Sequence, residues 1–321
     1  ALLVEDGVLS RRQGVGTLVV DRDAHSTIPW NVGIASQPRE PGAGGFFVEL
    51  AHRAHVQLVR EGCRCRLFPF HAGPVRAGEP FPHFGDLERC LAEGELDGVL
   101  LTSYEDHVDW PSVAEHGAVV CYAGVWERAP CGIVPDLAAM AVEAVAALRE
   151  RGCENLAMVL EHEPTPGFGR CLDGFRRGLA AAGLSQQHGE TVFAGRRAAE
   201  GGYAAARRLL GRPQEERPEG LILEDDFIAM GLTAALREAG SYRPEIAALC
   251  NRQLPLVFAL PAIRFEVDIE ELAAGAAAML MERLRTPALP DRVVWHRPHP
   301  AEAPEPVRLA LPGRRPSAAG S

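Results

Sequence analysis

Short apolar segments alternate with longer amphipathic segments from about residue 30 onward. The short segments have the length and composition of buried strands. The longer ones repeat apolar residues at helical spacing, as Phe47, Leu50 and Ala51 do. Alternating strands and helices are typical of a parallel sheet covered by helices on both faces. The pattern therefore predicts an α/β fold.

The alternation runs through two successive sets. The expected strands are 31–36, 64–70, 96–103 and 118–122 in the first set, and 156–160, 191–193, a strand at Leu221 and 246–250 in the second. The expected helices are 46–60, 86–92, 136–151, 168–182, 198–210 and one after the Leu221 strand. A further helix at 268–285 and strands at 292–296 and 307–311 follow. Two sets predict two lobes, and the late elements indicate a multi-strand hinge, which is more typical of binding proteins than of Rossmann enzymes.

Composition narrows the class of protein. The chain has 321 residues, a net charge of -10, and 24% charged and 47% hydrophobic residues, as ordinary globular proteins do. It has no apolar run of the roughly 18 residues that a membrane span needs, and no secretory signal is visible. Eight cysteines without a CxxC pair fit a reducing, cytoplasmic location. The acidic balance argues against nucleic-acid binding by the body of the chain.

The segment Gly220–Gly240 carries the clearest candidate chemistry. An apolar strand leads directly into Asp225 and Asp226, and a helix follows. Ligands bind at such strand-to-helix corners in open α/β sheets, and carboxylates accept hydrogen bonds from hydroxyl groups. Asp226 is equally suited to capping a helix that starts near Phe227. The local pattern leaves both roles open, and one side chain can fill both.

Other candidate motifs are weaker. The segment Gly42–Gly45 lacks the full spacing of a dinucleotide-binding loop, and we interpret it as a loop that faces the ligand. Cys63 and Cys65, with His71 and His83 nearby, do not match zinc spacing. No GxSxG elbow and no distinguished Cys/His pair is present. We therefore expect no metal, no cofactor, no catalytic residue and no enzymatic activity.

Three motifs stand in the order of a known family. They are Val134-Pro-Asp136 at the start of a helix, the segment Arg170–Leu179 with its Gly-Phe pair, and the corner Asp225–Gly231. Residues 30 to about 312 thereby resemble the effector-binding domain of the LacI/GalR family, which is similar in fold to periplasmic sugar-binding proteins. The resemblance implies a two-lobed, periplasmic-binding-protein-like fold. The implied lobes are about 30–126 with 255–286, and about 127–250 with 290–312, followed by a disordered tail at 313–321.

The resemblance also implies a ligand site between the lobes. The residues expected to bind the ligand are Asp225, Asp226, Arg170, Asn251, Arg252, Ser36, Tyr104 and Phe168. Two departures from the family pattern change the expected chemistry. Cys171 stands where the family has a ligand-clamping arginine, and Arg170 lies one step earlier. The family's Gly-aromatic-Asp after the last strand of the second lobe is replaced by the segment Cys250–Gln253.

Residues 1–22 resemble the end of a GntR-type winged helix-turn-helix. Strands at 9–13 and 17–20 would form the wing, joined by Gly14-Val-Gly16. The residues expected to contact DNA are Arg11, Arg12, Gly14, Gly16 and Thr17, because glycines allow close approach and arginines meet phosphates. A plain β-hairpin is the alternative. The recognition helix is expected upstream of Ala1, so residues 1–321 alone are not expected to bind a specific operator.

Both resemblances together predict a transcriptional regulator of the arabinose-repressor kind, most simply a repressor. A sugar or sugar derivative is the expected effector, operator DNA is reached through the full N-terminal domain, and a homodimer is expected without membrane contact. The helix 46–60 and the segment 254–260 are the expected dimer surfaces. A free-standing solute-binding protein and a sugar-processing enzyme that uses Asp225 and Asp226 are the alternatives.

Overall fold

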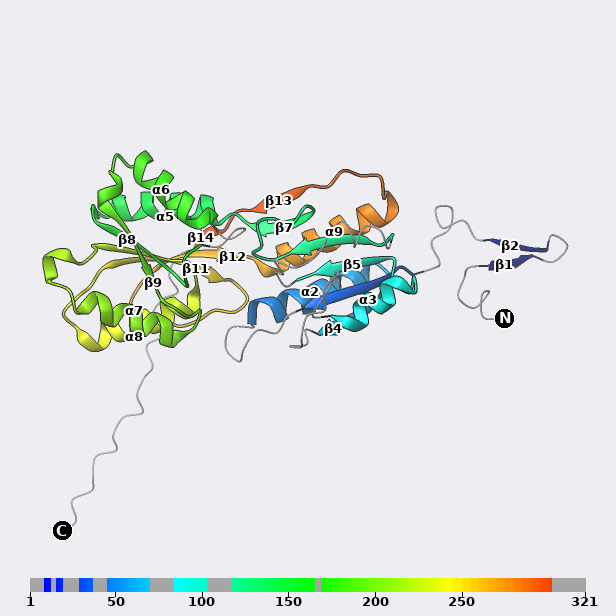
Figure 1. Ribbon diagram of the computed structural model, residues 1–321, viewed down its shortest axis with the longest axis horizontal. Helices are drawn as coiled ribbons and strands as arrows, with labels where there is room; N and C mark the ends of the chain where they lie inside the picture. The colour runs from blue at the N-terminus through cyan, green and yellow to red at the C-terminus, as the bar shows by residue number, and fades with distance from the viewer. Residues whose placement is uncertain are drawn as a thin grey trace, which may run out of the picture.

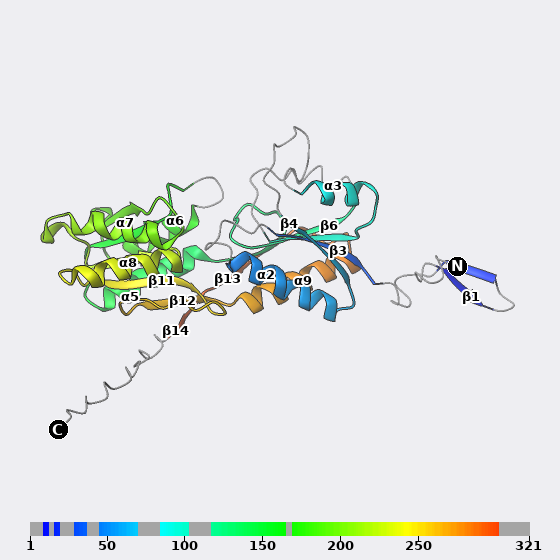
Figure 2. The same ribbon diagram turned by 90° about the horizontal axis from the view of Figure 1, so that it is seen from below.

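The computed structural model describes residues 9–12, 16–19, 29–36, 45–69, 84–102, 117–164 and 169–301. Within these ranges two six-stranded sheets lie side by side, each with helices on both of its faces (Figures 1 and 2). The predicted α/β class and the two-lobed arrangement are therefore confirmed. Within the same ranges, no helix is long and apolar enough to cross a lipid bilayer.

The first lobe is defined here by one of these sheets and its helices. Its strands are β3 (Asn31–Ser36), β4 (Arg64–Pro69), β5 (Gly98–Leu101), β6 (Val119–Ala123), β7 (Gly132–Pro135) and β13 (Val293–His296), in the order β13-β7-β6-β5-β3-β4. Its helices are α2 (Gly45–Arg60), α3 (Gly85–Ala92) and α9 (Ile269–Arg285). The apolar residues of α2 and α9 pack together against one face of the sheet, and α3 packs against the other.

The second lobe is built in the same way. Its strands are β8 (Leu156–Leu160), β9 (Gly189–Phe193), β10 (Gly220–Leu223), β11 (Glu245–Asn251), β12 (Ile263–Val267) and β14 (His299–Ala301), in the order β14-β12-β11-β10-β8-β9. Its helices are α5 (Leu137–Glu150), α6 (Arg170–Ala181), α7 (Ala199–Leu210) and α8 (Asp226–Ala239). Helices α5 and α6 cover one face, and α7 and α8 the other. Only β14 pairs antiparallel among the described strands of the two sheets.

The chain passes between the lobes three times. It leaves the first lobe after β7 and enters α5, returns from β12 to α9, and crosses again from β13 to β14. The predicted crossing back between lobes is thus present. The boundaries drawn from the sequence differ in detail: β12 and β13 lie in the opposite sheets from those assigned, and β7 belongs to the first sheet. A strand and the helix after it can serve different lobes, which a linear pattern does not reveal.

Two glycines of the sequence motifs are explained by helix packing that supports the cleft. A Cβ atom on Gly174 in α6 would lie 2.3 Å from the carbonyl oxygen of Ala138. A Cβ atom on Gly231 in α8 would lie 1.7 Å from the carbonyl oxygen of Ala199. Only glycine permits backbones to approach so closely. These positions therefore fix how α6 lies on α5 and how α8 lies on α7.

The N-terminal strands form the expected hairpin. Strands β1 (Leu9–Arg12) and β2 (Gly16–Val19) pair antiparallel, with Arg11 opposite Thr17 and Arg12 opposite Gly16. Gly14, in the predicted turn, lies outside the described residues, as do the predicted strand at 307–311 and the tail at 313–321. The pairing agrees with a wing and equally with a plain hairpin.

Candidate functional site

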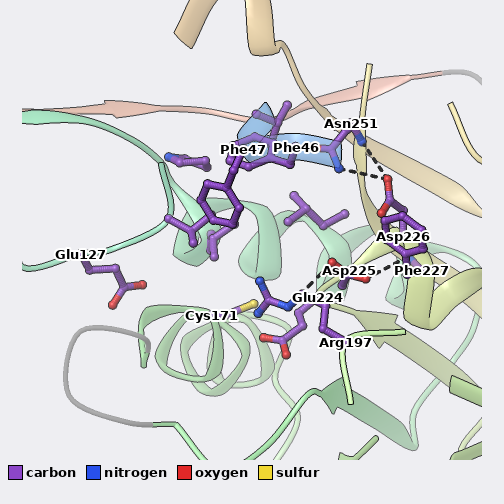
Figure 3. A pocket seen from close by; sticks show the side chains of 15 residues that line it. Phe46, Phe47, Glu127, Cys171, Arg197, Glu224, Asp225, Asp226, Phe227 and Asn251 are labelled. Carbon is purple, nitrogen blue, oxygen red and sulfur yellow. Dashed lines mark hydrogen bonds and ion pairs between the residues drawn. The ribbon is translucent and has the colours of Figure 1, made fainter. Parts of the chain in front are cut away.

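A cavity lies between the two lobes at the carboxyl ends of their strands (Figure 3). It measures about 850 Å³ when its open mouth is included. The residues that line it come from both lobes and from the connections between them. They are Phe46, Phe47, Val125, Glu127, Pro135, Leu137, Cys171, Arg197, Glu224, Asp225, Asp226, Phe227, Leu249, Asn251 and Val267. Its position, at the carboxyl ends of parallel strands, is where α/β folds bind small molecules.

Asp225 and Asp226 have different roles at the corner after β10. The Asp225 carboxylate accepts hydrogen bonds from the backbone N–H groups of Phe227 and Ile228, at 2.9 and 3.2 Å. Asp225 is therefore the N-cap of α8, which corrects the alternative that Asp226 caps a helix starting near Phe227. The helix begins one residue earlier than expected, at Asp226. Burial raises the pKa of Asp225, although the Arg197 guanidinium and the capped N–H groups oppose this.

Asp226 does not cap the helix, and it lines the wall of the cavity. Its side chain is buried, with 2% of the residue exposed. One carboxylate oxygen, Oδ2, accepts hydrogen bonds from the side-chain and backbone nitrogens of Asn251, at 3.1 and 3.3 Å. The other oxygen, Oδ1, is buried and has no hydrogen-bond partner among the described residues. Burial first, and then the charge of Asp225, raise the pKa of Asp226 to about 7.

Arg197 supplies the positive charge of the cavity wall. Its Nε atom lies 3.1 Å from Oε2 of Glu161 and 3.8 Å from Oδ2 of Asp225. Burial lowers the pKa of Arg197, but the carboxylates of Asp225, Glu224 and Glu161 outweigh it, and the pKa is raised. Arg197 is therefore a permanent cation that holds two carboxylates in place.

Two more carboxylates line the cavity. Glu224 accepts a hydrogen bond from the backbone N–H of Glu161, and burial raises its pKa. Glu127 lies across the cavity from Asp226 (Figure 3). It accepts hydrogen bonds from the backbone N–H of Arg170, at 3.2 and 3.3 Å, at the N-terminus of α6. Burial raises the pKa of Glu127 to about 7. Glu127 lies between strands β6 and β7 of the first lobe, and α6 belongs to the second lobe. These hydrogen bonds therefore connect the two lobes.

Aromatic rings form the first-lobe wall. Phe46 and Phe47, in the first turn of α2, meet edge to face with ring centroids 5.1 Å apart. Phe227 lines the opposite wall at the start of α8. Cys171 also lines the cavity, and it is buried at 3% exposure. Burial raises the pKa of the Cys171 thiol, so this side chain is neutral.

The structure brings only part of the predicted site together. Asp225, Asp226 and Asn251 line the cavity. The Arg170 guanidinium instead stacks on Trp295, 3.8 Å from the ring centroid, and its Nη2 atom lies 3.7 Å from Oδ1 of Asp136. The one-residue offset on α6 thus turns Arg170 to the lobe junction and Cys171 to the cavity.

The remaining predicted ligand residues lie elsewhere. Arg252 is exposed and donates a hydrogen bond of 2.9 Å to Asp268, the N-cap of α9. Ser36, the last residue of β3, is half-buried and is not among the lining residues. Tyr104 and Phe168 lie outside the described residues.

Sequence reasoning missed Arg197, Glu224 and Glu127. Glu224 directly precedes the Asp pair, so the corner pattern could have included it. Arg197 follows β9, and Glu127 follows β6; both lie after the carboxyl ends of strands, where ligands bind in α/β sheets. Neither residue stands in a motif of its own, and only the fold brings them to the cavity.

The comparisons with known proteins agree with this architecture. Residues 145–302 match the family described as the periplasmic binding protein-like domain. A search of curated protein sequences gave no match. A solved LacI transcriptional regulator from a Rhodococcus species superimposes with a TM-score of 0.68 at 17% identity, over 85% of this chain and 97% of the other.

Two further solved structures contain bound sugars. The transcriptional regulator CelR in complex with cellobiose has a TM-score of 0.66 at 20% identity, over 85% of this chain and 83% of the other. The Cra transcriptional dual regulator from Pseudomonas putida, in complex with fructose 1-phosphate, has a TM-score of 0.66 at 13% identity, over 85% and 98%. At such identities the likeness shows the fold. The chain has the two-lobed, periplasmic-binding-protein-like fold that these LacI-type regulators share.

Proposed function

We propose that this chain is the sensing part of a transcriptional regulator, and that a small hydroxylated molecule, most simply a sugar, binds between its lobes. The observation that carries the proposal is the cavity between the lobes, with hydrogen-bonding side chains mainly on the second-lobe wall and aromatic rings on the first-lobe wall. Its polar groups are mostly carboxylate and amide oxygens, which accept hydrogen bonds from hydroxyl donors. Aromatic rings beside them suit the apolar face of a sugar ring.

Regulation follows from the same geometry. A ligand that contacts both walls favours an arrangement in which the lobes are closed on it. Three connections join the lobes, so closure turns one lobe against the other as a unit. In a dimer such a rotation changes the spacing of attached DNA readers. We propose that the β1–β2 hairpin is the wing of such a reader, and that the regulator acts in the cytoplasm, as a repressor. The LacI-type regulators of the same fold support this reading.

A ligand screen tests the proposal. Mono- and disaccharides and their derivatives are screened for their effect on the thermal unfolding midpoint, and binding of each hit is measured by calorimetry. We expect a hit whose affinity falls by about tenfold, or roughly 1.4 kcal/mol, in Asn251→Ala, because one hydrogen-bonding side chain is lost. Ser36→Ala, outside the cavity lining, is the control and should bind normally. Equal affinity in wild-type chain and Asn251→Ala would place the ligand elsewhere.

A further inference from the structure

The cavity is lined by more carboxyl groups than cations. Four carboxylates line it, those of Glu127, Glu224, Asp225 and Asp226, against the single guanidinium of Arg197 among the described lining residues. Arg197 pairs with Asp225 and with Glu161. Across the described ranges, no ion pair involves Glu127, Glu224 or Asp226. Three of the four carboxyl groups of the cavity wall therefore have no ion-pair partner among the described residues.

Among these carboxyl groups, that of Asp226 has a buried oxygen atom without a hydrogen-bond partner among the described residues. Asp226 is 2% exposed and lines the cavity, and the oxygen without a partner is Oδ1. A buried acceptor without a partner is costly, and more so when it carries charge. The groups around it are Asp225 on its own helix, Asn251 on β11 and Arg264 on β12. Arg264 makes no hydrogen bond to Asp226: its Nη1 donates to the carbonyl of Leu256 at 3.1 Å and its Nε lies 3.5 Å from Glu266. Its charge still lowers the pKa of Asp226, against the larger effect of burial.

We propose, building on the function proposed above, that the effector is a small hydroxylated amine whose protonated amino group pairs with Asp226. An ammonium group donates three hydrogen bonds and accepts none, which complements a wall of acceptors. Phe46, Phe47 and Phe227 add aromatic faces to the same cavity, and cations are attracted to such faces. A phosphate or carboxylate ligand would instead meet the repulsion of the surrounding carboxylates.

The pKa values of the wall agree with this ligand class. Burial raises the pKa of Asp226 and of Glu127 to about 7, so both are only partly ionised near neutral pH. A cation next to a carboxyl group favours its ionised form. A metal ion fits less well, because no group of three or more potential His, Cys, Asp or Glu ligands converges in the part of the chain that the structure describes. The acidic wall therefore suits an organic cation with hydroxyl groups.

Matched ligand pairs test the inference. Glucosamine, galactosamine, mannosamine and amino-inositols are compared with the hydroxyl counterparts of each and with sugar phosphates, by thermal shift and then by calorimetry. We expect an amine to bind at least about tenfold more tightly than its hydroxyl counterpart, the scale of one charge-assisted hydrogen bond. N-acetylation of that amine, which removes the charge, should abolish the advantage.

Two variants then test whether Asp226 is the group that pairs with the amine. Asp226→Asn keeps the shape and the contact with Asn251, whereas Asp173→Asn removes an acid whose side chain is 68% exposed on α6. We expect Asp226→Asn to weaken amine binding by about tenfold, while binding of the hydroxyl counterpart changes less than about threefold and Asp173→Asn binds both normally. Equal losses for both ligands in Asp226→Asn would show a merely structural role and overturn the inference.

The outcomes separate the two proposals. Tightest binding of a neutral sugar or a sugar phosphate would overturn the amine inference and leave the effector-binding function standing. No binding by any of the three ligand classes at millimolar concentration would contradict both. The unfolding midpoints of the unliganded variants confirm that each is folded.

Discussion

Asp225 and Asp226 are neighbours in the sequence, but the fold gives them different surroundings. Asp225 caps α8 and approaches Arg197, whereas Asp226 receives hydrogen bonds only from Asn251 and keeps one buried oxygen without a partner in the described chain. At a helix N-terminus the side chain of the N-cap residue accepts hydrogen bonds from the backbone N–H groups of the first turn. The next residue is already helical, and its side chain here faces inward. Which of the two aspartates caps α8 and which faces the cavity therefore depends on the single residue at which the helix begins.

The raised pKa of Asp226 predicts a pH-dependent stability. A carboxyl group whose pKa is near 4 when unfolded and about 7 when folded stabilises the folded state while it is protonated. This contribution is fully present below about pH 4 and is lost as the pH rises through about 7. Asparagine does not ionise, so between pH 5 and pH 8 the free energy of unfolding of Asp226→Asn should rise relative to that of the wild-type chain by roughly 2–3 kcal/mol.

Thermal unfolding midpoints at the two pH values measure this effect. The exposed replacement Asp173→Asn is the control and should follow the wild-type chain at both. Parallel pH dependence of Asp226→Asn and the wild-type chain would mean that Asp226 is already ionised in the folded state, contrary to this account.

At the scale of elements, periodicity predicted most helices and the central strands, because each repeats a pattern that burial imposes. The strands β7, β12 and β14 were not predicted. Strand β14 runs through His299-Pro-Ala301, a proline-containing segment that pairs only at the edge of the sheet, where proline is tolerated. Strand β12 (Ile263–Val267) carries Arg264 and Glu266 among its apolar residues, so its composition did not mark it as a buried strand.

The site was predictable where it coincides with a motif. The corner at Asp225 and Asp226 and the end of β11 at Asn251 both directly follow apolar strands. Arg197 and Glu127 come from loops after other strands, and they meet the corner only through sheet order and lobe packing. The orientation of Arg170 and Cys171 depends on a helix rotation of about 100° per residue, which the family pattern alone could not settle.

The β1–β2 hairpin gives a prediction at this scale. In a protein that carries the hairpin within a complete winged-helix domain, Arg11→Ala with Arg12→Ala should reduce the slope of log affinity for DNA against log salt by about 2, because two phosphate contacts are lost. The adjacent pair Arg176→Ala with Arg177→Ala, on α6 of the second lobe, is the control. An unchanged slope in the hairpin variant would identify a plain hairpin.

At the scale of the whole molecule, α2 and the segment 254–260 keep apolar side chains at the surface. Val48 and Val59 of α2 are 50% and 49% exposed, and Val257 is 86% exposed. The spacing of the two α2 valines places them on one helix face. Apolar side chains that stay exposed along one helix face are typical of interaction surfaces. We therefore keep the expectation of a homodimer through these surfaces as a prediction.

Sedimentation tests the dimer. The chain should sediment as a dimer at micromolar concentration, and Val59→Glu should dissociate it, because a charge would be buried without a partner. Leu67→Glu, at a residue 56% exposed on β4, is the control and should remain dimeric. A wild-type monomer would contradict the prediction.

The central claim is that one small molecule is held between the lobes. It is tested most directly by a crystal structure of the chain with the tightest ligand from the screens. The account predicts that the ligand lies in the cavity, within about 3.2 Å of Asp226 or Asn251, as hydrogen bonding requires, and against Phe46 or Phe47. A ligand bound outside the cavity, with Asp226 and Asn251 still paired only with each other, would contradict it.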